Sequence, residues 1–149
     1  MDLIISQNKN YLISNNLIEK LNSVFLMICD EEKLSDCSIN LKILDDKEMK
    51  DLNNRFTKKN LSTDVLSFTN EDISKEITGN LGDIAINYEY VERESKEFNK
   101  TFDNHMIHIL IHGIYHILGF DHQNDKTADI MENKEILLLK KLNINNPYK

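Results

Sequence analysis

Histidines are concentrated in one short part of this chain. All five lie between residues 105 and 122, and His105, His108, His112 and His116 follow one another at steps of three, four and four. At 3.6 residues per turn, side chains at these steps occupy an arc of about 80° on one face of an α-helix. Because the residues between them are almost all apolar, we expect that helix to be buried. Buried imidazoles must be hydrogen-bonded or bound to metal, since each unsatisfied group costs roughly 1–3 kcal/mol.

Three of the histidines have the spacing of a metal site. Residues 112–122 are HGIYHILGFDH, so His116 follows His112 by one turn and Gly119 precedes His122. Histidines at i and i+4 can bind one ion from a single helix. Gly119 can adopt a positive φ, end the helix and let the chain present His122 to the same ion. We therefore predict that this histidine triad (His112, His116 and His122) binds one Zn²⁺, with nickel or another divalent ion as an alternative.

A three-histidine site has a chemical consequence. Three nitrogen ligands leave a fourth position on zinc for water, whose pKa is then lowered to about 7, so that it becomes a usable nucleophile. For His105 and His108, on the same helix face, we favour ordinary packing with hydrogen-bond partners. His108 could alternatively support the site or face the substrate, because it lies one turn before His112.

The same spacing, HxxxHxxGxxH, occurs in the metzincin peptidases. Those enzymes carry a glutamate directly after the first histidine as general base, whereas Gly113 occupies that position here. A peptidase mechanism of that type therefore lacks its base. Three candidates remain for the general base: hydroxide on zinc, a substrate phosphate and a ribose 2′-hydroxyl.

Hydrophobic periodicity predicts the elements that must position the histidines. The predicted strands are Leu3–Ile5, Cys37–Leu44, Val65–Phe68 and Gly82–Ile86, and the predicted helices are Leu17–Ile28, Asp45 or Asp46 to about Arg55, Tyr88–Phe98, Asp103–Leu118 and Thr127–Leu142. This mixture indicates an α+β fold in which helices cover a small sheet. The length and the absence of linkers or repeats predict a single domain of residues 1–149.

Composition restricts the partners. With 40% hydrophobic and 29% charged residues the chain has the composition of a folded globular domain, not of a disordered one. A net charge of -7 disfavours general binding to nucleic acid, so an RNA substrate would need a local basic patch. Arg55, Lys58 and Lys59 form one short basic run. The two lysines could steer a phosphate backbone, although we favour solvated side chains for them.

We expect a cytoplasmic protein with no membrane partner. The first residues have neither a basic region nor a long apolar run, and no stretch approaches the roughly 18 apolar residues of a membrane span. Cys29 and Cys37 are too few for a disulfide framework and are predicted to be ordinary thiols in a reducing compartment.

Three segments together resemble the YbeY family of bacterial endoribonucleases, also called rRNA maturation factors. The histidine segment is similar to the family's HGxLHLxGYDH, and the departures at Tyr115, Ile117 and Phe120 keep the apolar character. Residues 52–55 (LNNR) followed by 63–68 (TDVLSF), and residues 81–86 (LGDIAI), resemble the other two family segments.

The resemblance implies a zincin-like fold with a small mixed β-sheet and the metal site on a central histidine-rich helix. It implies zinc on the three histidines and single-strand-specific RNA cleavage in 16S rRNA 3′-end maturation and ribosome quality control. Its implied partners are single-stranded rRNA and the ribosome or ribosomal proteins. It also marks Arg55 as a catalytic basic residue beside the metal, where an arginine can bind phosphate oxygens bidentately. The alternative for Arg55 is a solvated residue at a helix end.

Two aspartates lie in the matching segments. We favour a turn or capping role for Asp64, next to Thr63. Asp83 could orient a ligand histidine through its second ring nitrogen.

Two further functions fit the same residues. The first is a metal-dependent hydrolase of another substrate, such as a peptide, which Gly113 argues against. The second is a ribosome-associated binding factor with weak or no catalysis and a structural zinc. Structural zinc sites usually have four protein ligands, and no cysteine lies near the triad to supply the fourth.

Overall fold

The structure is a computed structural model that describes residues 1–70 and 79–148. In chain order its elements are β1 (Asp2–Gln7), α1 (Asn15–Glu31), β2 (Ser38–Leu44), α2 (Asp46–Thr57), β3 (Val65–Thr69), β4 (Asn80–Asn87), α4 (Tyr88–Glu97), α5 (Phe102–Ile117) and α6 (Asp125–Lys141). Every predicted helix and strand is present, with ends shifted by a few residues. The α+β class is confirmed.

The strands form one mixed sheet in the order β1-β2-β4-β3. β1, β2 and β4 are parallel, with Ile5 opposite Leu41 and Leu41 opposite Ile84, whereas β3 runs antiparallel to β4. β3 therefore forms an edge of the sheet. This arrangement confirms the predicted small mixed sheet.

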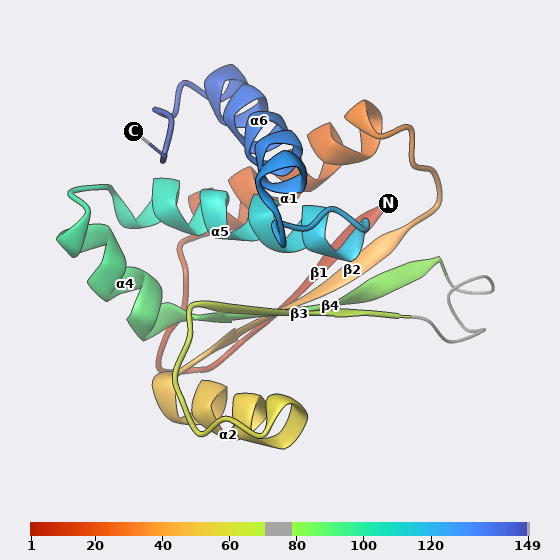
Figure 1. The fold of residues 1–149 in the computed structure, drawn as a ribbon. Coiled ribbons are helices and arrows are strands. Elements are labelled where there is room, and N and C mark those ends of the chain that lie inside the picture. Colours follow the sequence, from red (N-terminus) through yellow and green to blue (C-terminus); the bar gives the residue numbers. More distant parts are fainter. Residues whose placement is uncertain (71–78, 149) are drawn as a thin grey trace.

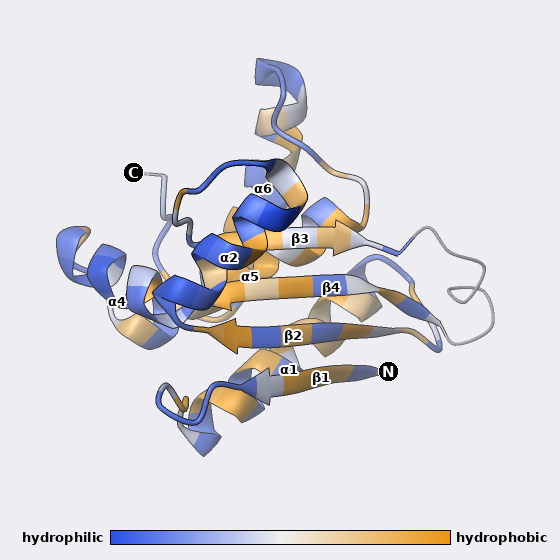
Figure 2. Cartoon of the chain, turned by 90° about the horizontal axis from the view of Figure 1, so that it is seen from below, coloured by the Kyte–Doolittle hydropathy of each residue, from blue (hydrophilic) through white to orange (hydrophobic). Residues whose placement is uncertain are grey.

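Helices cover both faces of the sheet unequally. α1, α5 and α6 lie on one face, and α2 lies on the other (Figure 1). Seen from that other face, α2 crosses in front of the sheet while α1 and α5 lie behind it (Figure 2). The core cluster of buried apolar residues includes members of the sheet, α1, α5 and α6, whereas Met49 of α2 is buried outside it.

α5 occupies the centre of that layer. It packs against β3, β4, α1, α4 and α6, and Met106, Leu110 and Ile114 are completely buried. Thr101 caps its first turn by accepting a hydrogen bond from the amide of Asn104 at 3.1 Å. The predicted burial of the histidine-rich helix is therefore confirmed.

Cys29 and Cys37 are buried free thiols with their Sγ atoms 3.7 Å apart, as predicted. Across the described ranges 1–70 and 79–148, no helix combines the length and the apolar character that a membrane crossing requires.

A small polar cluster joins α2 to the end of β4. The carboxylate of Asp46 accepts hydrogen bonds from Ser62 Oγ, from Asn87 Nδ2 at 2.9 Å and from Arg93 at 3.3 Å. Asn87 is completely buried and also caps α4, because its side chain accepts from the amide of Tyr90. The hydrogen bonds from Ser62 and Asn87 lower the pKa of Asp46 to about 2.

We predict that Asp46→Asn destabilises the protein at neutral pH by about 1–2 kcal/mol, since hydrogen bonds to a charged acceptor are lost. Because the folded-state pKa lies below the ordinary value of 3.8, this stabilisation is complete above about pH 4 and is lost as the pH falls toward 2. Urea unfolding of both proteins across this pH range measures the difference. A difference that stays constant down to pH 2 would contradict the role of the carboxylate charge.

Candidate metal centre

The end of α5 determines where the triad can meet. Gly119 has φ +99°, its amide donates to His116 O at 3.1 Å, and the amide of Phe120 donates to Tyr115 O at 3.0 Å. This pair of bonds is the Schellman arrangement, and the rings of Tyr115 and Phe120 pack edge to face at 5.5 Å, as such ends favour. The predicted glycine-dependent reversal is therefore present, and it returns His122 toward the helix.

The three imidazoles converge. The Nε2 atoms of His116 and His122 are 3.3 Å apart, and one ring nitrogen from each of the three histidines lies within 4.8 Å of the other two. The ring centroid of His112 lies 5.0 Å from that of His116 and 5.3 Å from that of His122. The triad predicted from spacing is thus one cluster that could hold a metal ion.

The donor set, three imidazole nitrogens, is of the kind that zinc binds. Two nitrogens that each lie 2.0–2.1 Å from a tetrahedral ion are about 3.3–3.4 Å apart, which matches the separation of His116 and His122. Burial, together with the neighbouring His112 and His122, lowers the pKa of His116 below its ordinary value. Since a ligand imidazole must be neutral, this shift favours the protonation state that binds metal.

The cluster opens onto an accessible hollow of about 300 Å³. Its wall consists of the triad on one side and Asp64, Val65, Leu66 and Ser67 on the other, so it lies along the first residues of edge strand β3. A substrate could therefore approach the triad between β3 and the end of α5.

Behind the triad lies a buried carboxylate that sequence reasoning missed. Glu135 on α6 is completely buried, and its Oε1 lies 3.2 Å from His112 Nδ1 and 3.1 Å from His108 Nε2. Burial by itself would raise the pKa of Glu135, but hydrogen bonds from His108 and His112 outweigh it and hold the pKa at about 2. A signal did exist, because Met131, Glu135 and Leu138 share one helical face whose other members are apolar.

His105 has its own carboxylate. It is 4% exposed, and its Nε2 lies 3.2 Å from Glu94 Oε1, which confirms the packing that we favoured for it. Burial, followed by the negative charge of Asp64, raises the pKa of Glu94 to about 7. Burial also lowers the pKa of His105 to about 4, so the imidazole is neutral beside Glu94.

Asp64 and Asp83 have different surroundings. The carbonyl of Asp64 accepts from the amide of Asn87 at 2.9 Å, so the residue joins the start of β3 to the end of β4, and Asp64 also lies along the triad hollow. Asp83 is exposed on β4, and its carboxylate accepts from Asn40 Nδ2 at 2.8 Å. In the described part of the chain, the carboxylate hydrogen-bonded to a triad histidine is that of Glu135 on α6.

Arg55 is exposed in the last turn of α2, and Lys58 caps that helix with φ 63°. α2 covers the opposite face of the sheet from α5 (Figure 1), and Arg55 is not among the residues that line the triad hollow. A contact between Arg55 and the substrate would therefore have to form across the β3 edge, and a catalytic role for Arg55 stays a prediction.

Gly113 lies where α5 touches the sheet. A Cβ atom added there would come within 3.1 Å of Ser67 Oγ and 3.2 Å of Ile84 Cδ1. Ser67 Oγ also donates to the carbonyl of Gly113 at 3.3 Å. A larger residue at this position would press on the side chains of Ser67 and Ile84, which would have to shift by a few tenths of an ångström.

Comparison with known proteins decides the family. The family model described as "Endoribonuclease YbeY" matches residues 3–143. The chain belongs to the YbeY endoribonuclease family. Proteins named endoribonuclease YbeY from Francisella philomiragia and Francisella tularensis subsp. novicida are each 37% identical to it, over 97% of this chain and 92% and 90% of their own lengths. A third YbeY relative, from Francisella tularensis subsp. holarctica, is 40% identical over 82% of this chain and 78% of its own length.

A solved structure supports the fold of this YbeY member. A solution structure of a Thermotoga maritima protein matches with a TM-score of 0.64 and 24% identity, and the match covers 99% of this chain and 96% of the other.

We predict that Gly119→Ala weakens zinc binding and lowers the free energy of unfolding by about 1–3 kcal/mol, because φ +99° is strained for any residue with a Cβ. No heavy atom within 4 Å obstructs a Cβ there, so the effect comes from the backbone and not from a clash. Competition with a chromophoric chelator measures the affinity. Gly119→Asn, which tolerates positive φ better, should recover part of the loss, and equal losses in both variants would contradict this explanation.

Proposed function

We propose that this chain is a single-domain, zinc-dependent, single-strand-specific endoribonuclease of the cytoplasm that acts in 16S rRNA 3′-end maturation and ribosome quality control. Its substrate would be single-stranded rRNA, on or near the ribosome or ribosomal proteins. The observation that carries the proposal is the three-histidine cluster facing an accessible hollow, in a chain that belongs to the YbeY family.

His112, His116 and His122 would hold the ion. Bound zinc supplies a Lewis acid for a phosphate oxygen and lowers the pKa of a coordinated water. Around it, the chain's own residues position the ligands: α5 provides two imidazoles from one rigid helix, and the Gly119 turn provides the third. The hollow lies against edge strand β3, so a substrate strand could approach the triad along that edge.

The two alternative functions are less well supported. A peptidase of the metzincin type needs a base at position 113, where this chain has a glycine packed against the side chains of Ser67 and Ile84. A purely structural zinc would usually have a fourth protein ligand, whereas the metal-binding group found among residues 1–70 and 79–148 consists of three histidines.

Cleavage of labelled single-stranded rRNA fragments tests the proposal. We predict chelator-sensitive cleavage that zinc restores, and a loss of at least about 100-fold in His116→Ala, since even residues behind the ligands change metal affinity or activity by about 10–100-fold. Gln123→Ala, an exposed neighbour of His122, is the control and should cleave normally. Cleavage that resists chelation, or that is undiminished in His116→Ala, would overturn the proposal.

A separate prediction concerns Arg55. If its guanidinium binds a phosphate of the substrate, Arg55→Ala should lower kcat/KM by roughly 10–100-fold without changing zinc content, and Arg55→Lys should recover only part, because it lacks bidentate geometry. Since Arg55 lies outside the triad hollow, the loss should be larger for an RNA long enough to cross β3 than for a dinucleotide. Equal cleavage by Arg55→Ala and wild type on long RNA would reject the role.

A further inference from the structure

The buried carboxylate of Glu135 collects three hydrogen-bond donors from two parts of the chain. Its Oε1 lies 3.1 Å from His108 Nε2 and 3.2 Å from His112 Nδ1, and both of its oxygens lie 3.1 Å from the hydroxyl of Tyr148. Glu135 itself is completely buried in α6. An isolated buried carboxylate is strongly unfavourable, so a site that retains one must supply such donors.

The contact with His112 specifies which nitrogen of that ring is free. A carboxylate only accepts, so His112 Nδ1 must carry the proton that it donates to Glu135. The lone pair of the neutral ring then resides on Nε2, the nitrogen that remains to bind an ion. The same argument makes Nε2 of His108 the protonated nitrogen toward Glu135, and His108 Nδ1 is buried without a partner in the described structure.

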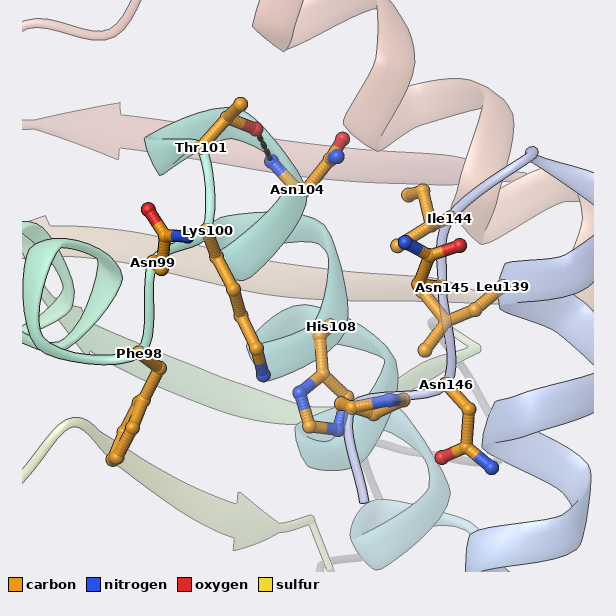
Figure 3. Close-up of a pocket in the computed structure, with 11 residues that line it drawn as sticks. Phe98, Asn99, Lys100, Thr101, Asn104, His108, Leu139, Ile144, Asn145 and Asn146 are labelled. Carbon is orange, nitrogen blue, oxygen red and sulfur yellow. Dashed lines mark hydrogen bonds between the residues drawn. The ribbon is translucent and has the colours of Figure 1, made fainter. Parts of the chain in front are cut away.

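Tyr148 brings the C-terminal segment into this arrangement. Its ring packs edge to face on His108 at 5.5 Å, and its hydroxyl donates to both oxygens of Glu135. The segment that leads to it, including Ile144 and Asn146, runs beside His108 along a hollow of about 310 Å³ (Figure 3). Tyr148 therefore links the C-terminal segment to both Glu135 and His108.

We propose that Glu135 is a positioning residue for the metal, which fixes the tautomer and ring orientation of His112, and that Tyr148 holds the Glu135 carboxylate in place for this purpose. The inference rests on the metal site of the proposed function, but not on RNA as the substrate. Carboxylate partners of ligand histidines typically change metal affinity by about 10–100-fold when removed. A glutamate retained for packing alone would have no such effect on the affinity of the folded protein.

Zinc affinity of the full chain, measured by competition with a chromophoric chelator, tests this without RNA. We expect Glu135→Gln to weaken zinc binding by about 10–100-fold, because the amide keeps the shape and an acceptor oxygen but loses the charge. Tyr148→Phe keeps the ring on His108 and loses only the hydroxyl, so we expect a smaller loss of about 3–10-fold. Asp129→Asn removes the same charge from an exposed position of α6 and should bind zinc like the wild type.

A second readout separates positioning from folding. Thermal unfolding of the metal-free proteins should show Glu135→Gln unfolding below the wild-type temperature, since charge-assisted hydrogen bonds are lost, but above the temperature of the zinc measurement, so that the affinity is compared between folded proteins. With cobalt in place of zinc, the visible absorption bands should change in Glu135→Gln and stay unchanged in Asp129→Asn. Wild-type zinc affinity and cobalt bands in Glu135→Gln would overturn the proposal. A lack of RNA cleavage by the wild-type protein would overturn the proposed function and leave the zinc measurements to decide the role of Glu135.

Discussion

The structure depends on one constraint, which is that every imidazole on a buried helix must find a partner. α5 is apolar on almost all sides and lies in the centre of the core, so its histidine face cannot simply turn toward water. Glu94 is hydrogen-bonded to His105, and Glu135 is hydrogen-bonded to both His108 and His112. Beyond these pairs the helix ends and the remaining imidazoles converge. Along this single helix, the histidines near the N-terminus are hydrogen-bonded to carboxylates, and those near the C-terminus belong to the cluster that could hold a metal ion.

The same burial determines which chemistry the site can support. α5 packs so closely on β3 and β4 that a Cβ atom at position 113 would press on the side chains of Ser67 and Ile84, and with glycine there the chain has no glutamate where the metzincins carry their general base. Acid and base groups must then come from other elements or from the substrate. Asp64 enters the hollow from the loop before β3, and Glu135 approaches the triad from α6. The polar groups around the triad thus come from several elements of the fold.

The electrostatic design is also local. The net charge of -7 repels a phosphate chain at long range, and carboxylates lie close to the site. A divalent cation on three neutral imidazoles would reverse the sign of the potential at the place where a phosphate must bind. The basic run around Arg55 lies on α2, across the sheet edge, so attraction at this site would depend mainly on the metal.

The sequence by itself determined the local features. Residue periodicity placed the helices and strands, and the i, i+4 histidines with Gly119 predicted a triad that the structure brings together, because helix geometry and a positive-φ turn are decided within about ten residues. Only the tertiary structure decided the long-range partners. Asp83 was a reasonable candidate to orient a ligand histidine, yet its carboxylate accepts a hydrogen bond from Asn40 instead. The carboxylate beside His112 is that of Glu135, which follows it by 23 residues in the sequence. The packing of the helices over the sheet decides which carboxylate lies beside an imidazole and on which face of the sheet Arg55 lies. The spacing of residues along the chain does not specify this packing directly.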